Sequence, residues 1–194
     1  IGHYYNYAIM DSYCRFMKHK GYDVFQPFGY DAFGLPAENY AKKVGRDPRD
    51  VTYENISKFR EQMQHMNTLF DEKLITSDHS YQKWTQWIFT KLMEHGLCYK
   101  KFGSVNWCNS CGTVLANEQV KDGKCERCSS EVEMKELEQY YFKITAYKDR
   151  LIKNLDWIDY PKSTIEQQRH WLDKLQDWCV SRQRKWGCPI PVEG

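Results

Sequence analysis

Two pairs of cysteines constrain the fold of this chain more than any other feature of its sequence. Cys108 and Cys111 form one C-x-x-C pair. Cys125 and Cys128 form a second pair, and thirteen residues lie between the two. Two such pairs supply four thiolates, the usual ligand set of a structural zinc ion, in a small zinc ribbon. The alternative is a pair of degenerate knuckles without metal. A closed four-sulfur set leaves no position for substrate, so we expect a structural role only.

The composition is that of an ordinary folded domain. A chain of 194 residues can bury one core and a small satellite, and 28% charged residues without a membrane-length apolar run predict a soluble protein with no membrane partner. The net charge of +2 gives no argument for nucleic-acid binding. The cysteines outside the pairs lie in apolar settings and no signal peptide is visible, so we expect a reducing, cytoplasmic location.

Both ends of the sequence resemble cut ends. The chain begins at Ile1 without an initiator Met, and it ends at Gly194 directly after the run P-I-P-V-E. We therefore expect a fragment of a longer protein.

The spacing of apolar residues in the first forty positions predicts an α/β fold. It favours a helix over Gly2–Lys20 that ends at Gly21, and a buried strand over Val24–Phe28. A loop at Gly29–Glu38 follows, with Pro36 in the first turn of a new helix. Strand, loop and helix in this order build doubly wound sheets, so we expect a partial Rossmann-like parallel sheet with the zinc ribbon inserted into it.

The remaining sequence predicts further helices and strands. Thr52 is the expected N-cap of one helix, and Gly96 is expected to end another. The expected helices are Thr52–Leu69, Ser80–His95, Thr145–Leu155 and Ser163–Leu175, and the expected extended segments are Leu97–Trp107, Glu131–Ile144 and the start of Trp178–Val192.

Three residues in two segments are candidates for ligand contacts. Gly2 and His3 begin a helix, where a backbone can approach phosphate closely and a His can stabilise developing charge, although a Gly-His pair alone is common. Asp31 follows the predicted strand, at the sheet edge where α/β folds bind ligands. Its carboxylate could accept hydrogen bonds from a ligand ammonium, or it could cap its own turn. The spacing leaves both alternatives open.

A basic run lies near the end of the chain. Ser181–Lys185 carries three positive charges in five residues. Such a run is usually a solvated face. Trp178 and Trp186 on its flanks favour a packed strand that lines a pocket instead.

Taken together, several motifs resemble the leucyl-tRNA synthetases, a family of class I aminoacyl-tRNA synthetases. They occur in the family's order and cover nearly the whole chain. The motifs are I-G-H at Ile1–His3, G-Y-D-A-F-G-L-P-A-E at Gly29–Glu38, V-N-W-C at Val105–Cys108, T-V-L-A-N-E-Q-V at Thr113–Val120, F-K-I-T-A-Y at Phe142–Tyr147 and D-W-C-V-S-R-Q-R-K-W-G-C-P-I-P at Asp177–Pro191.

The resemblance implies ATP-dependent activation of leucine to leucyl-adenylate and transfer to tRNA(Leu), with Mg²⁺ accompanying ATP and Zn²⁺ in the ribbon. Gly2 and His3 match the ATP-binding signature, in which His3 would stabilise phosphate charge, and Asp31 matches the residue that holds the leucine ammonium. We expect a monomer. Residues 1–97 would be the first half of the catalytic domain, 98–144 the zinc-ribbon insertion, and 145–194 the connecting helices and the start of the second half.

The sequence also departs from the family. The first His of the H-I-G-H signature and the K-M-S-K-S signature are absent, so we expect this chain alone to be inactive. Only five residues separate Trp171 from Asp177, where most leucyl enzymes carry a hydrolytic editing domain, so we expect that domain to be lacking. The alternative function is a synthetase-derived paralogue that binds RNA or a protein without catalysis. A free-standing zinc-ribbon module would leave the motifs around Asp31 and Asp177 unexplained.

Overall fold

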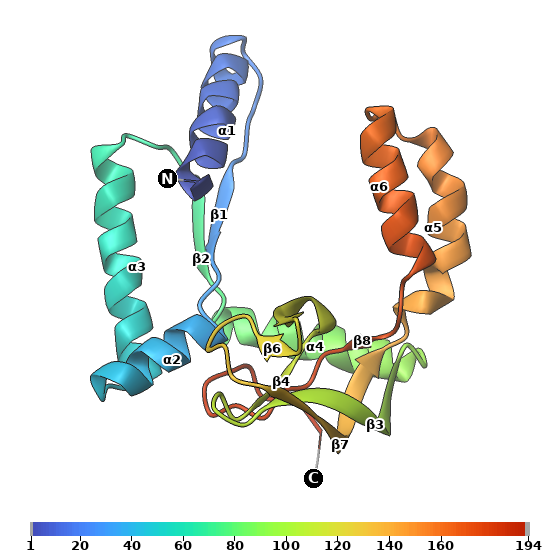
Figure 1. Ribbon diagram of the computed structural model, residues 1–194. Coiled ribbons are helices and arrows are strands. Elements are labelled where there is room, and N and C mark those ends of the chain that lie inside the picture. Colours follow the sequence, from blue (N-terminus) through green and yellow to red (C-terminus); the bar gives the residue numbers. More distant parts are fainter. Residues whose placement is uncertain (1, 193–194) are drawn as a thin grey trace. The chain divides into compact units, whose positions relative to one another are not determined.

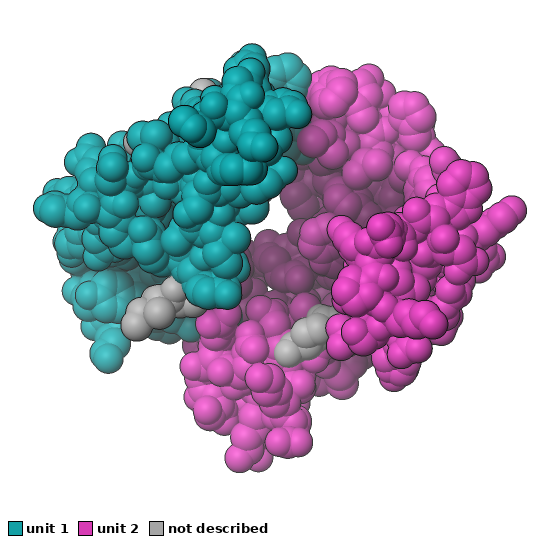
Figure 2. Space-filling view, turned by 90° about the horizontal axis from the view of Figure 1, so that it is seen from above, with its two compact units in different colours: residues 1–85, 185–189 teal, residues 86–184, 190–194 magenta. Residues whose placement is uncertain are grey.

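The computed structural model describes residues 2–192, without the side chains of residues 72, 73 and 118 (Figure 1). The chain forms two compact units (Figure 2). Unit 1 comprises residues 1–85 and 185–189, and unit 2 comprises residues 86–184 and 190–194. Within the described residues, no helix is both long and apolar enough to cross a lipid bilayer.

Unit 1 is built around two parallel strands. Tyr30 lies opposite Ile75 at the end of this pair. The mixture of helices with a parallel pair confirms the predicted α/β class. Its elements are α1 (Gly2–His19), β1 (Pro27–Tyr30), α2 (Leu35–Val44), α3 (Pro48–His65), β2 (Glu72–Ile75) and the start of α4 (His79–Glu94).

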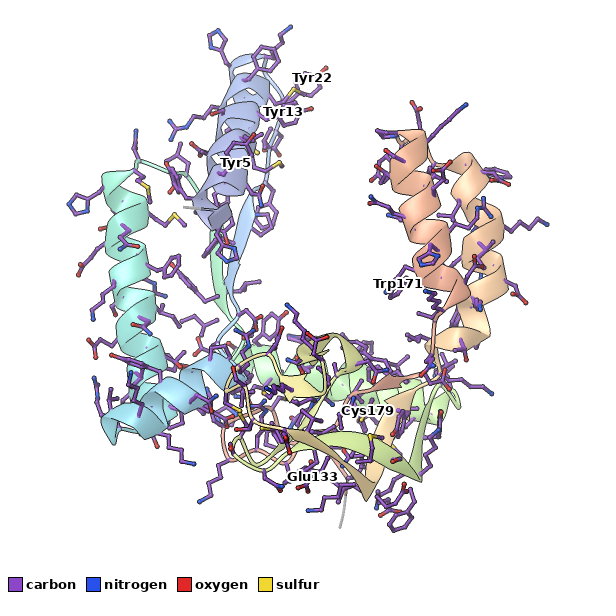
Figure 3. All side chains as sticks on the ribbon, viewed as in Figure 1. Tyr5, Tyr13, Tyr22, Glu133, Trp171 and Cys179 are labelled. Atoms are coloured by element: carbon purple, nitrogen blue, oxygen red, sulfur yellow. The ribbon has the colours of Figure 1, made fainter. Side chains whose placement is uncertain are left out.

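The core of unit 1 is aromatic and lies against β1. Side chains along β1 alternate, so that Phe28 and Tyr30 are buried, with ring centroids 4.9 Å apart. The two faces of α1 differ in the same way: Tyr4 and Tyr7 pack against this core, whereas Tyr5 is 67% exposed (Figure 3). The first turn of α1 and the carboxyl end of β1 therefore share one core. The buried members of the cluster are Phe28, Tyr30, Ala32, Ile56, Met63 and Ile75.

Two carboxylates fix the chain where it enters β2. Asp11 on α1 is buried and accepts a hydrogen bond from the backbone N–H of Leu69 at 2.9 Å. Asp71 accepts one from the backbone N–H of Gln26 at 2.6 Å, and this bond is the main reason why the pKa of Asp71 lies below its usual value. The segments before β1 and β2 are thus tied together.

Two expectations for unit 1 need correction, and one strand was not predicted. The N-cap of α3 is Asp47, whose side chain accepts from the N–H of Arg49 at 2.8 Å, and Thr52 is buried within the helix. Asp before Pro is a stronger start signal than an isolated Thr, because Pro needs no hydrogen-bond acceptor in the first turn. The strand expected at Val24–Phe28 lies at Pro27–Tyr30. β2 was not predicted, since the short sequence E-K-L-I has no clear apolar period.

Unit 2 contains an antiparallel sheet in the order β4-β3-β7-β8. β3 and β7 pair over their full length, from Cys98 opposite Phe142 to Cys108 opposite Val132. The expected helix over Ser80–His95 is present as α4, and Gly96 follows it with a positive φ of 67°. The remaining elements are β3 (Cys98–Cys108), β4 (Thr113–Leu115), η1 (Asn117–Gln119), β5 (Val120–Lys121), β6 (Lys124–Cys125), β7 (Val132–Phe142), η2 (Ile144–Tyr147), α5 (Lys148–Asn154), η3 (Leu155–Trp157), α6 (Lys162–Asp173) and β8 (Trp178–Cys179).

Asp177 is the main polar junction of unit 2. Its carboxylate accepts hydrogen bonds from the hydroxyl of Tyr99 at 2.7 Å and from the hydroxyl and backbone N–H of Thr145 at 2.6 and 3.2 Å. Burial opposes ionisation of Asp177, but these bonds outweigh it and lower its pKa. Burial and the bond to Asp177 raise the pKa of Tyr99 to about 12. Asp177 thereby joins β3, η2 and the segment that enters β8.

Replacement of Asp177 by Ala should lower the free energy of unfolding of the chain by about 2 kcal/mol, because three donors lose their acceptor. Since the carboxyl pKa is lower in the folded state, the contribution of Asp177 should be complete above the unfolded pKa and should disappear as pH falls through the folded value. Urea unfolding at pH 7 and at acidic pH measures both effects. The matched control is Asp159→Ala, at an exposed position, which should change stability by less than about 0.5 kcal/mol. Equal effects of the two variants at pH 7 would contradict the assigned role.

Candidate active site and metal centre

Asp31 lies at the carboxyl end of β1, on a loop that is joined to the end of β2. The hydroxyl of Thr76 accepts from the N–H of Ala32 at 2.9 Å and donates to the carbonyl of Tyr30 at 3.1 Å. The backbone N–H of Thr76 donates to the same carbonyl at 3.1 Å. Asp31 itself is exposed. A carboxylate at the carboxyl edge of a parallel pair is placed where α/β folds bind ligands.

The structure gives no support to the alternative in which Asp31 caps its own turn. Among the hydrogen bonds within residues 2–192, none is accepted by the Asp31 side chain, and the loop is held by Thr76 instead. The carboxylate can therefore serve an external donor such as an ammonium group.

His3 lies in the first turn of α1 and is exposed. Its neighbour Tyr4 packs against the cluster that contains Tyr30 and Ala32. The structure thus places the helix start, formed by Gly2 and His3, and the Asp31 loop beside one core. Over residues 2–192 it records no direct contact between His3 and Asp31.

The loop after β2 contains polar residues that the sequence did not indicate. The hydroxyl of Tyr53 donates to the carboxylate of Asp78 at 2.5 Å and accepts from the hydroxyl of Ser77 at 3.2 Å. Burial, followed by the bond to Asp78, raises the pKa of Tyr53. The amide of Gln82 donates to the carbonyl of Ser77 at 2.6 Å. These contacts fix the loop beside Thr76. The sequence would have drawn attention to Ser77 and Asp78 only if β2, which they follow, had been predicted.

The four paired cysteines come together in unit 2. Their sulfurs all lie within 4.8 Å of one another. The Sγ of Cys128 is 3.4 Å from that of Cys108 and 3.5 Å from that of Cys111. Sulfurs bound to one tetrahedral zinc lie about 3.8 Å apart, given Zn–S bonds of about 2.3 Å. The cluster therefore has the size of a four-sulfur metal site. No disulfide joins cysteines within residues 2–192.

Both knuckles have the same backbone turn. The N–H of Gly112 donates to the carbonyl of Cys108 at 2.8 Å, and the N–H of Ser129 donates to that of Cys125 at 2.9 Å. Gly112 and Ser129 each follow a pair and adopt positive φ values of 62° and 59°. Hydrogen bonds from Ser130 lower the pKa of Cys128 to about 6, whereas burial raises that of Cys108. A bound cation would favour the thiolate form at all four positions.

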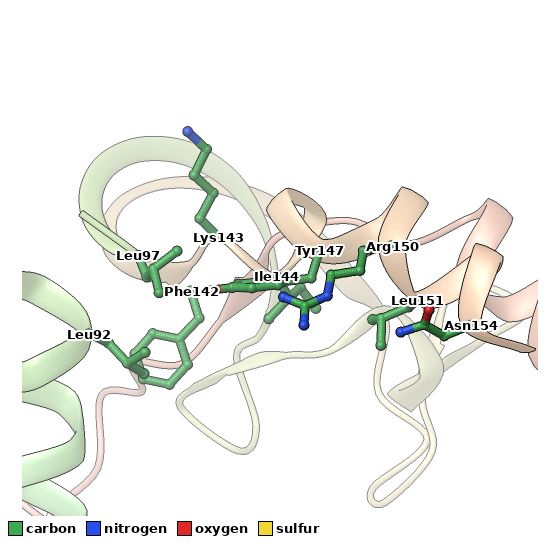
Figure 4. A pocket seen from close by; sticks show the side chains of 9 residues that line it. All are labelled: Leu92, Leu97, Phe142, Lys143, Ile144, Tyr147, Arg150, Leu151 and Asn154. Carbon is green, nitrogen blue, oxygen red and sulfur yellow. The ribbon is translucent and has the colours of Figure 1, made fainter. Parts of the chain in front are cut away.

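Unit 2 also has an open pocket of about 420 Å³ between the end of α4, the end of β7 and α5 (Figure 4). Apolar side chains dominate its lining, and Lys143, Arg150 and Asn154 are its polar residues other than Tyr147. The residues predicted for ATP, leucine and metal are absent from this lining. The pocket therefore shares no residue with the candidate ATP, leucine and metal sites. It is lined by Leu92, Leu97, Phe142, Lys143, Ile144, Tyr147, Arg150, Leu151 and Asn154.

The fold and the ordered motifs correspond to a known family. The family described as "tRNA synthetases class I (I, L, M and V)" matches residues 1–193. The chain belongs to this family. Within it, the chain is 54% identical over 175 residues to a leucine–tRNA ligase of Clostridium botulinum, with 89% of the chain and 22% of that protein covered. It is 56% identical over 178 residues to a leucine–tRNA ligase of Caldanaerobacter subterraneus, covering 91% of the chain and 22% of that protein.

Two solved structures are also similar to this chain. A leucyl enzyme of Agrobacterium radiobacter K84, described as a ternary complex with tRNA and LeuAMS, matches with a TM-score of 0.80 and 35% identity, over 88% of this chain and 22% of that one. Methionyl-tRNA synthetase of Mycobacterium tuberculosis shares the fold, with a TM-score of 0.83 and 22% identity, over 98% of this chain and 39% of that one. The chain spans about one fifth of the length of the curated relatives that it matches.

Proposed function

We propose that this chain is part of the catalytic region of a leucine–tRNA ligase. The observation that carries the proposal is its identity of 54–56% with leucine–tRNA ligases over about nine tenths of the chain. The position of Asp31, exposed at the carboxyl edge of the parallel pair, supports recognition of an amino acid at this edge.

The proposed reaction has two steps. A carboxylate oxygen of leucine attacks the α-phosphorus of ATP, the bond from that phosphorus to the bridging oxygen breaks, and pyrophosphate leaves. A hydroxyl of the terminal ribose of tRNA(Leu) then attacks the leucyl carbonyl, and AMP leaves. Neither step needs a protein nucleophile, so positioning and electrostatic stabilisation supply the catalysis.

The chain offers groups suited to each part of the first step. The Asp31 carboxylate would accept hydrogen bonds from the leucine ammonium, which orients the attacking carboxylate. His3 would donate to phosphate oxygens of ATP, and the backbone at Gly2 would let the nucleotide approach the helix start, where N–H groups favour anions. Mg²⁺ would accompany ATP and neutralise phosphate charge.

We further propose that Cys108, Cys111, Cys125 and Cys128 hold a structural zinc ion. The size of the sulfur cluster and the matching knuckle turns support this assignment. Cys108 ends the long strand β3, but the other strands near the cluster, β4, β5 and β6, contain only three, two and two residues, so a metal would stabilise this part of the ribbon.

The short link between α6 and β8 supports the absence of a hydrolytic insertion at this point. The Nζ of Lys148 donates to the carbonyl of Asp173 at 2.6 Å, at the end of α6. Asp177 is held by three hydrogen bonds a few residues later. Both ends of the link are thus held by hydrogen bonds within unit 2. This is expected if α6 connects directly to β8 with no domain inserted between them.

Leucine-dependent exchange of pyrophosphate into ATP by the full-length protein tests the proposed function. Asp31→Asn should reduce kcat/KM for leucine by about 10- to 100-fold, because a charge-assisted hydrogen bond to the ammonium is lost. Asp23→Asn, at an exposed position before β1, is the matched control and should retain activity. Absence of leucine-dependent exchange in the full-length wild-type protein would overturn the proposal.

Purified protein should contain about one zinc ion per chain, as measured by elemental analysis. Cys125→Ser should abolish this content and increase proteolysis of residues 105–132, because three remaining ligands hold the metal poorly. Cys188→Ser, which alters a cysteine outside the cluster, should leave the zinc content unchanged. Zinc content that is independent of Cys125 would contradict the assignment.

If the full-length protein lacks a hydrolytic domain, tRNA(Leu) charged with isoleucine or norvaline should persist in its presence. An apolar pocket separates such similar side chains by only about 10- to 200-fold, so some mischarging is expected. The decay of mischarged tRNA is measured with and without the protein, and the two rates should agree. Rapid hydrolysis by the full-length protein alone would contradict this expectation.

A further inference from the structure

Trp186 contacts the loop that carries Asp31, although it lies 154 positions after Ala32 in the sequence. Its indole Nε1 donates to the carbonyl of Ala32 at 3.3 Å. Its ring meets that of Phe33 edge-on, with centroids 5.0 Å apart and an interplanar angle of 65°. Both residues directly after Asp31 are therefore held by one side chain.

The backbone of Trp186 holds the far end of the same loop. Its N–H donates to the carboxylate of Glu38 at 3.3 Å. Glu38 lies in the first turn of α2, the helix that follows the loop. Trp186 thus contacts the loop next to Asp31 and also the helix in which the loop ends.

The segment around Trp186 belongs to unit 1, although the residues on both sides of it belong to unit 2. Lys185–Pro189 is counted with unit 1, whereas Arg184 and Ile190 are counted with unit 2. Within this segment, the Sγ of Cys188 lies 3.9 Å from the carbonyl of Gln82. Gln82 in turn holds Ser77 in the loop after β2. The segment therefore contacts the loop after β1 directly, and it lies near Gln82 of α4, which in turn holds the loop after β2.

We propose that Trp186 is a positioning residue for the amino-acid site, and that it holds the Asp31 loop in the conformation that receives a substrate ammonium group. The inference rests on the proposed function. Thr76 holds the loop backbone from the side of β2, and Trp186 holds it at Ala32, Phe33 and Glu38. An exposed carboxylate on a loop loses orientation when such contacts are removed, and catalysis is sensitive to errors of about 1 Å.

The test uses two variants of the full-length protein. Trp186→Phe keeps an aromatic ring against Phe33 but removes the Nε1–H donor, and Trp186→Ala removes both contacts. KM for leucine in pyrophosphate exchange should rise about 3- to 10-fold in Trp186→Phe and further in Trp186→Ala. KM for ATP should change less than about twofold in Trp186→Phe. Trp178→Phe is the matched control, since Trp178 contacts Phe142 in unit 2, and it should preserve both constants.

A second measurement does not depend on activity. Hydrogen–deuterium exchange of the backbone amides of residues 31–34 should be faster in Trp186→Phe than in the wild type and in Trp178→Phe. Unchanged exchange in this loop, or equal increases of the two KM values, would overturn the positioning role while leaving the proposed function intact. A wild-type protein without leucine-dependent exchange would overturn the proposed function, and the amide measurement would still decide whether Trp186 holds the loop.

Discussion

The parallel pairing of β1 with β2 is the constraint on which the candidate active site depends. Parallel strands cannot be joined by a tight turn, so the chain between them must form a long crossover, which here contains α2 and α3. The same pairing brings the loops after both strands to one edge, where Thr76 bonds to Tyr30 and Ala32. Asp31 owes its position to this bonding and to the aromatic core beneath it.

The two units reach stability by different means. Unit 1 buries an aromatic cluster between α1, β1 and α3, and carboxylates such as Asp11 tie its loops. In unit 2, β4, β5 and β6 contain three, two and two residues, and the nearby Cys108 and Cys125 are fully buried. A bound metal is one way to stabilise such short strands, whereas the aromatic packing of unit 1 lies beside the loop that carries Asp31.

The sequence predicted the features that depend on local signals. Gly21 and Gly96 mark helix ends because they adopt positive φ, and Pro36 marks the start of α2 because its position needs no N–H acceptor. The family motifs led to Asp31 and His3, whose roles stay predictions. β2 and the hydrogen bonds of Trp186 and Asp177 were not predicted, because they join segments far apart in the chain and leave no periodic pattern. In the sequence, Trp178 and Trp186 on the flanks of the basic run indicated that this segment packs against other residues, but not which residues Trp186 contacts.

The contact between Trp186 and Ala32 also has a consequence for folding. Closing a loop of 154 residues costs conformational entropy that grows with its length. The pairing of β3 with β7 joins Cys98 to Phe142, and the pairing of β7 with β8 joins Tyr141 to Cys179. Once these pairs form, about half of the intervening chain no longer contributes to the length of the loop. Strand pairing within unit 2 therefore lowers the entropic cost of bringing Trp186 to the Asp31 loop.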